Sequence, residues 1–233
     1  LSRSALRLLP VLPPAVEVLV ELVLAFAAIV LIVAIERLHL AVARAFHGRS
    51  DFDTARAEYI RAGQLFEQAD ETDSDDAIIG RLGRIHMEAT SGQPERLQEA
   101  GRLLEQERQR LGARGNGARV GFALAQAEGA YGYMADIELA EAAFRRAGEV
   151  GEADGSGVPP TLLLKAKSSL VLVLMRLGRA QDAEPIARAI VAESQRLRGA
   201  DHPDTLVTRQ HWVTSLSMSG RDEEALRAST ALL

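Results

Sequence analysis

Histidine is the residue type in this chain best suited to bind a metal ion or to transfer a proton near neutral pH. The five histidines are His39, His47, His86, His202 and His211. No two of them have the helical spacing of metal ligands with a third ligand nearby. We therefore predict no metal site, and we expect surface or capping roles, with His211 as the one histidine that contacts a ligand.

Nucleophilic catalysis has no recognisable arrangement in this sequence either. Cysteine is absent, which removes disulfides, thiolate zinc sites and cysteine nucleophiles together. The serines Ser168, Ser169 and Ser215 have no histidine and acid arranged around them that would activate a hydroxyl group. We predict that the chain is not an enzyme, has no catalytic residues and needs no cofactor.

Two loop segments have the composition of ligand-binding loops but lack their key residues. The acidic run 70–76 lacks the central glycine and the bidentate glutamate of a calcium loop, so we interpret it as a solvated linker that caps a helix at Ala77. The glycine-rich segment 112–117 follows a predicted helix and has no Gly-Lys-Ser/Thr ending. We interpret that segment as a turn.

The amino-acid composition predicts that α-helices position the histidine and serine side chains named above. Hydrophobic residues make up 47% of the chain and aromatic residues only 4%, with helix-favouring Ala, Leu, Arg and Glu abundant. An all-α fold with a real core follows. The net charge of -5 argues against a nucleic-acid-binding surface, because phosphate neutralisation needs a basic face.

An apolar segment precedes the amphipathic part of the chain. After a tail over residues 1–14, residues 15–36 read as a hydrophobic helix that is apolar on every face between Leu22 and Ile35. A transmembrane helix, a helix buried by a partner and an unprocessed signal segment are the alternatives, and flanking arginines do not choose an orientation. We assign residues 37–233 to a single repeat domain.

The amphipathic helices come in pairs that repeat along the chain. Turn positions at Ser50, Gly92, Ala135, Gly178 and Gly220 are separated by 42, 43, 43 and 42 residues. Such a period predicts a solenoid of about five helical hairpins. The first helices are predicted at 32–48, 77–91, 118–133, 161–177 and 203–219, and the second helices at 53–69, 95–111, 137–150, 180–197 and 222–233.

Alanine recurs five residues after the turn position in four of the five units. These alanines are Ala55, Ala140, Ala183 and Ala225, while the second unit has Ala100 three residues later, after Pro94. A helix that folds back on its partner needs a small side chain where the two backbones cross. We therefore expect these alanines at the helix crossings.

The last unit contains the most specific motif, Gly-Ala-Asp-His-Pro-Asp-Thr-Leu at 199–206, followed by Arg209, Trp212, Leu216, Gly220-Arg221 and Glu224-Ala225. This motif resembles the longer variety of tetratricopeptide repeat (TPR), as in kinesin light chains and many bacterial signalling proteins. The resemblance implies a right-handed α-solenoid whose first helices face a ligand. It implies binding of a protein or peptide in a concave groove, with Lys165, Lys167, Arg209 and His211 as candidate contacts.

The arrangement of an apolar helix before such repeats also resembles membrane-anchored bacterial regulators and kinases. That resemblance implies a single membrane span, a periplasmic repeat domain and a kinase or winged-helix effector upstream of this segment. A cytoplasmic location is the alternative. For function, the alternative is a structural module that mediates homo-oligomer assembly and has no ligand of its own.

Overall fold

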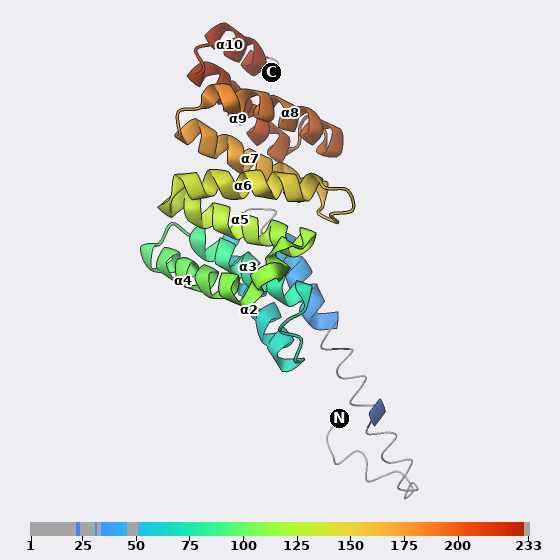
Figure 1. Ribbon diagram of the computed structural model, residues 1–233. Coiled ribbons are helices and arrows are strands. Elements are labelled where there is room, and N and C mark those ends of the chain that lie inside the picture. The colour runs from blue at the N-terminus through green and yellow to red at the C-terminus, as the bar shows by residue number, and fades with distance from the viewer. Residues whose placement is uncertain (1–21, 24–30, 32–33, 46–50, 231–233) are drawn as a thin grey trace, which may run out of the picture.

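The computed structural model describes residues 22–23, 31, 34–45 and 51–230, and every regular element within these ranges is helical. Residues 34–45 form a helix that precedes the labelled elements. Figure 1 shows the helices stacked in chain order, from α2, α3 and α4 at one end to α10 at the other. The labelled elements are α2 (Phe52–Gln68), α3 (Asp75–Ala89), α4 (Pro94–Leu111), η2 (Gly112–Asn116), α5 (Ala118–Ala135), α6 (Ile137–Glu152), α7 (Pro160–Arg176), α8 (Ala180–Arg198), α9 (Pro203–Met218) and α10 (Asp222–Thr230).

The predicted pairing of helices into hairpins is confirmed. Helix 34–45 pairs with α2, and the other hairpins are α3–α4, α5–α6, α7–α8 and α9–α10. Inside the described ranges the helix ends lie within two residues of the predicted ends. The predicted ends at 32, 48 and 233 fall outside those ranges.

Three hairpin turns contain a glycine in the left-handed region, at Gly92 (φ 73°), Gly178 (φ 73°) and Gly220 (φ 75°), and the last two close with the same hydrogen bond. The N–H of Arg179 donates to the carbonyl of Leu174 over 2.8 Å, and the N–H of Arg221 donates to the carbonyl of Leu216 over 3.0 Å. These bonds form the Schellman ending of a helix, which glycine adopts without steric cost. The turn glycines of the sequence pattern are therefore helix stops.

The same two arginines join successive hairpins. Arg179 Nη1 lies 2.8 Å from Glu141 Oε1 on α6, and Arg221 Nη1 lies 3.2 Å from Glu184 Oε2 on α8. Each ion pair joins a turn to the second helix of the preceding hairpin. The repeat thus includes an electrostatic contact as well as an apolar one.

Small residues allow the helices of a hairpin to cross closely, as predicted. Ala55, Ala100, Ala140 and Ala183 have no exposed surface, and Ala225 is 7% exposed. In the third hairpin, a Cβ atom on Gly132 would lie 2.7 Å from the backbone nitrogen of Ala140. No side chain fits at that crossing.

The apolar core runs through the stack. One cluster contains Leu82, Leu104 and Leu124 of the second and third hairpins, and another contains Phe144 and Leu174 of the third and fourth. The contacts that join neighbouring hairpins are α2 with α3, α3 with α5, α6 with α7, and α8 with α9. Each hairpin therefore buries its apolar faces against its neighbours, as solenoid physics requires.

The acidic linker 70–76 is more firmly held than the predicted solvated linker. Ser74 Oγ accepts a hydrogen bond of 3.2 Å from the N–H of Ala77, so a serine caps α3. Arg119 Nη2 on α5 donates to Asp76 Oδ1 over 2.6 Å. An ion pair across the stack thus holds the start of α3.

The glycine-rich segment predicted as a turn is the short 3-10 helix η2. It contacts both α4 and α5. Most of the contact between the second hairpin and α5 comes from α3 rather than from α4.

Most of the predicted hydrophobic helix, residues 15–36, lies outside the described residues. Leu22, Val23 and Leu31 are described as helical, with exposed fractions of 62%, 58% and 60%. Across the described ranges, none of the helices combines the length and apolar character that crossing a membrane requires. The transmembrane helix therefore stays a prediction.

Candidate protein-binding surface

The first helices of the hairpins share one accessible stripe. On α7 the stripe runs through Lys165, Ser169, Leu172 and Arg176, at steps of three or four residues that keep side chains on one helix face. We call the accessible stripes of α3, α5, α7 and α9 the first-helix wall. Its repeat-equivalent members on the other helices are His86 and Thr90, Gln126 and Tyr133, and His211, Thr214 and Met218.

Polar residues from three successive first helices lie in one region of this wall. His86 on α3 forms a hydrogen bond with the backbone of Gln126 on α5, and it lies close enough to Lys165 on α7 to feel its charge. The Nε2 atom of Gln126 is buried and has no hydrogen-bond partner in the described part of the chain. We call these three residues the polar row.

Burial controls the charge state of the polar row. It lowers the pKa of His86 to about 4, and the nearby ammonium group of Lys165 acts in the same direction. Burial also lowers the pKa of Lys165, although Asp204 opposes this shift. At neutral pH the row therefore offers a neutral imidazole, an amide and a partly desolvated cation.

The acid closest to the polar row is already engaged. Asp204 Oδ2 lies 2.8 Å from Arg198 Nη1, and the Arg198 side chain is only 13% exposed. This ion pair joins the end of α8 to the start of α9. The charge of Asp204 still acts on Lys165 and opposes the lowering of its pKa.

An arginine and an aromatic ring connect α5 and α7 further along the wall. The Arg176 guanidinium lies 4.9 Å from the centroid of the Tyr133 ring, and Arg176 Nη1 donates to the Tyr133 carbonyl oxygen. Such a cation over a ring is stabilising and holds the guanidinium in place. Arg176 is exposed, so its remaining donors face solvent.

The four contacts predicted from the sequence do not form one site. Residues two apart on a helix are separated by about 200°. Lys165 and His211 accordingly lie on the first-helix wall, whereas Lys167 and Arg209 point to the other side. Lys167 Nζ forms an ion pair with Glu152 at the end of α6.

His211 lies at the joint between α7 and α9. Its Nδ1 atom is buried and accepts no hydrogen bond from the described residues, and burial lowers the pKa of its imidazole. It lines a void with Ser168 and Thr208 that does not admit a water molecule. This void is a packing gap. A ligand can contact His211 only at the accessible edge of its imidazole ring.

The predicted capping role is confirmed for His202. His202 is the N-cap of α9, because its Nδ1 accepts a 3.1 Å hydrogen bond from the N–H of Asp204. His86 is half-buried on the first-helix wall, and burial lowers its pKa to about 4. Sequence analysis also missed Gln126, and only the stagger between successive helices brings these two residues together.

The second helices have a different charge organisation. Their exposed acids and arginines pair within a helix, as in Glu99 with Arg102 at 2.7 Å and Glu193 with Arg196 at 2.5 Å. A hydrogen bond from Arg102 lowers the pKa of Glu99. Over the described helices, the second helices contain twelve basic and seventeen acidic residues, and the first helices nine basic and six acidic residues.

The first helices also bury half of their acids. Glu36, Glu88 and Glu128 are 0%, 1% and 4% exposed. Glu128 Oε1 lies 2.7 Å from Arg108 Nε on α4, and Arg146 on α6 binds its other oxygen. These acids hold neighbouring helices together and contribute little negative surface.

Metal binding finds no support in the described ranges, which contain no group of three or more His, Asp or Glu residues placed to hold an ion. No protein-family model matches the sequence, and no curated protein matches it.

Solved structures do resemble the fold. Two crystal structures of the nearly identical TPR-like repeats of a candidate kinesin light chain from Podosopora anserina, one of them a single-residue variant, superimpose with a TM-score of 0.57. They are 16% and 15% identical to this chain, and each match covers 84% of this chain and 92% of the other. This chain therefore has the predicted fold, a right-handed α-solenoid of TPR-like hairpins.

Proposed function

We propose that this chain is an interaction module that binds a protein or peptide partner on its first-helix wall, with acidic side chains of the partner at the polar row. The observation that carries the proposal is the convergence of His86, Gln126 and Lys165 from three successive helices. The Gln126 amide is a buried donor with no partner in the described chain. A carboxylate that accepts from it would satisfy this donor and pair with Lys165.

The charge distribution supports an acidic partner. Lys165 and Arg176 are the charged residues among the named members of the first-helix wall, although the whole chain has a net charge of -5. A local cationic wall on an acidic molecule directs a negatively charged partner to one face, and it does so more strongly at low salt. TPR-like arrays present such a wall as an extended surface.

Substitution of Lys165 or Lys167 tests whether the first-helix wall binds an acidic peptide. The probe is a fluorescent peptide of alternating glutamate and leucine, and the control peptide has glutamine in place of each glutamate. We expect the full chain to bind the glutamate peptide more tightly, and Lys165→Gln to weaken binding about tenfold, or about 1.4 kcal/mol. Lys167→Gln changes the same residue type on the opposite face and should leave the dissociation constant unchanged.

Fluorescence anisotropy measures both constants. Equal losses in the two lysine variants would show that binding depends on net charge alone and would refute the wall as the site. Preference for the glutamine peptide would refute the acidic partner.

The alternative of a structural module makes a different prediction. If homo-oligomer assembly were the function, the chain would self-associate over micromolar concentrations and would not bind the peptide. Sedimentation velocity across that range distinguishes the two roles, and our proposal predicts a sedimentation coefficient that does not change with concentration.

The proposed setting is a membrane-anchored bacterial signalling protein, with residues 15–36 as a single span, a periplasmic repeat domain and an upstream kinase or winged-helix effector. Its support is the uninterrupted apolar sequence from Leu22 to Ile35. Flotation with liposomes tests the span: the full chain should float, and a chain lacking residues 1–36 should not. Flotation of both would place the membrane contact elsewhere.

A further inference from the structure

A glutamate occupies a core position of helix 34–45. The buried stripe of this helix runs through Glu36, Leu40 and Ala43, which are 0%, 2% and 0% exposed. Leu40 marks the direction of the stripe, because its Cδ1 atom lies 3.6 Å from where a Cβ of Gly80 on α3 would be. Glu36, one turn earlier, therefore faces the start of the second hairpin.

The carboxyl group of Glu36 has no basic or amide donor among the described residues. Both of its oxygens are buried, and the side chain placed to share a hydrogen bond with it is another acid, Glu71, which raises the pKa of Glu36. Burying an ionised carboxylate without donors is costly, and a protonated carboxyl group avoids most of that cost. The position thus favours the neutral acid.

The charged groups around Glu36 act mostly in the same direction. Burial raises its pKa, and the carboxylates of Glu71 in the linker and Asp76 in α3 raise it further, while Arg37 opposes the shift. The nearby arginines are directed at Asp76: Arg119 lies 2.6 Å from it, Arg37 3.8 Å and Arg44 4.0 Å. None of them forms an ion pair with Glu36.

We propose that Glu36 is a proton-operated latch: its protonated carboxyl group lets helix 34–45 dock on the second hairpin, and loss of the proton loosens that helix. The latch would regulate the N-terminal end of the solenoid. It does not depend on the proposed partner binding, because Glu36 lies outside the polar row.

The direction of the pH effect follows from the raised pKa of Glu36. An ordinary glutamate titrates near 4.5. Below that pH the carboxyl group is neutral in the docked and the loosened states alike, and docking is at its strongest. As the pH rises above 4.5, the loosened state loses its proton first, so docking weakens until the docked group also ionises.

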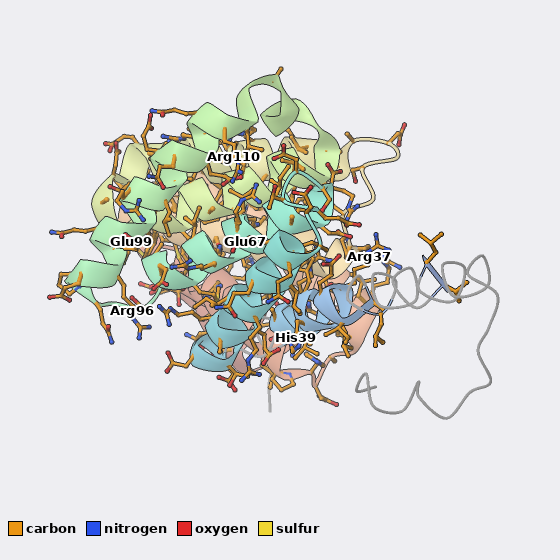
Figure 2. The ribbon with its side chains drawn as sticks, turned by 90° about the horizontal axis from the view of Figure 1, so that it is seen from below. Arg37, His39, Glu67, Arg96, Glu99 and Arg110 are labelled. Atoms are coloured by element: carbon orange, nitrogen blue, oxygen red, sulfur yellow. The ribbon has the colours of Figure 1, made fainter. Side chains whose placement is uncertain are left out.

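A second polar contact of this helix must be separated from the latch. His39 Nδ1 lies 2.5 Å from Glu58 Oε2 on α2. Figure 2 shows His39 and Arg37 on helix 34–45 and Glu67 on α2. Glu67 is exposed and provides a matched glutamate control.

The test is hydrogen–deuterium exchange of the full chain, corrected for intrinsic rates, at about pH 5 and about pH 8. We expect protection of residues 34–45 to fall several-fold at the higher pH, while protection of α5 and α6 stays constant. Glu36→Gln should remove most of the fall. In Glu67→Gln and in His39→Gln, protection of residues 34–45 should still fall at the higher pH, because Glu36 is unchanged in both variants.

A fall in protection that persists in Glu36→Gln, or one that His39→Gln abolishes, would overturn the latch. So would protection of residues 34–45 that does not change with pH in the unaltered chain. If Glu36→Gln lowered protection in α5 and α6 as well, the substitution would destabilise the whole chain, and a second variant, Glu71→Gln, would be needed to test the latch. Glu71→Gln removes an acid that raises the pKa of Glu36. This variant should reduce the pH dependence of protection at residues 34–45 without altering α5 or α6, and an unchanged pH dependence would refute the latch.

Discussion

The two walls of the solenoid use charge in opposite ways. On the second helices, exposed acids and arginines pair three or four residues apart, as Glu141 and Arg145 do at 2.8 Å. On the first helices, the acids Glu88 and Glu128 are buried between helices, and Lys165 and Arg176 remain on the accessible stripe. One wall is self-neutralised and suited to water. The other keeps half of its acids inside and two cations on its accessible stripe.

This difference teaches that the net charge of the chain is a poor guide to its binding face. The second helices contribute an excess of five acids, which the first helices offset with an excess of three basic residues. Exposed ion pairs within the second helices contribute little to stability. The local arrangement on the first helices decides what they attract.

The largest effect should come from a buried acid of the first helices. Glu128→Ala removes the shared partner of Arg108 and Arg146 and should lower the free energy of unfolding by about 3 kcal/mol. Glu99→Ala, on an outer face, should lower it by less than about 1 kcal/mol. Urea denaturation measures both, and equal losses would break the contrast between the walls.

Next in size is the pH response of the polar row. The pKa of His86 is lowered from 6.5 to about 4 by burial, so His86 contributes stability above pH 6.5 that is lost as the pH falls toward 4. The loss should be on the order of 2 kcal/mol. His86→Gln should flatten this part of the stability profile.

His202, the exposed N-cap of α9, provides the control for that measurement. His202→Asn keeps a side chain that can cap the helix, so the acid-side loss should persist in this variant. If His86→Gln left the profile as steep as before, the imidazole would not be neutral and buried as described.

The smallest effect should separate two arginines. Arg176→Ala removes a cation from the face of Tyr133 and should cost about 1 kcal/mol, because that contact joins two hairpins. Arg145→Ala removes only a pair within α6 and should cost about 0.3–0.5 kcal/mol. Thermal denaturation compares the loss of stability in the two variants. A larger loss in Arg145→Ala than in Arg176→Ala would contradict the stabilising contact between Arg176 and Tyr133.

Periodicity was enough to predict the hairpins. Turn glycines such as Gly178 stop helices by backbone geometry, and alanines such as Ala140 and Ala183 mark crossings, so both are local signals that a sequence shows directly. The start of α3 was missed by two residues because Ser74, rather than the acids after it, provides the cap.

The candidate binding surface was predictable only in part. Lys165 and Lys167 were predicted together as contacts, although residues two apart do not share a helix face. His86 and Gln126 gave no such signal. Their proximity depends on how α3 and α5 are staggered, and the charge of Lys165 reaches them across a third helix.

The central claim is that a partner lies on the first-helix wall, and site-specific photo-crosslinking tests it most directly. A crosslinking residue replaces Ser169 on α7 in one variant and exposed Gln106 on α4 in another. We predict that the glutamate–leucine peptide is captured at position 169 and not at position 106. Capture at 106 equal to or greater than that at 169 would contradict the account.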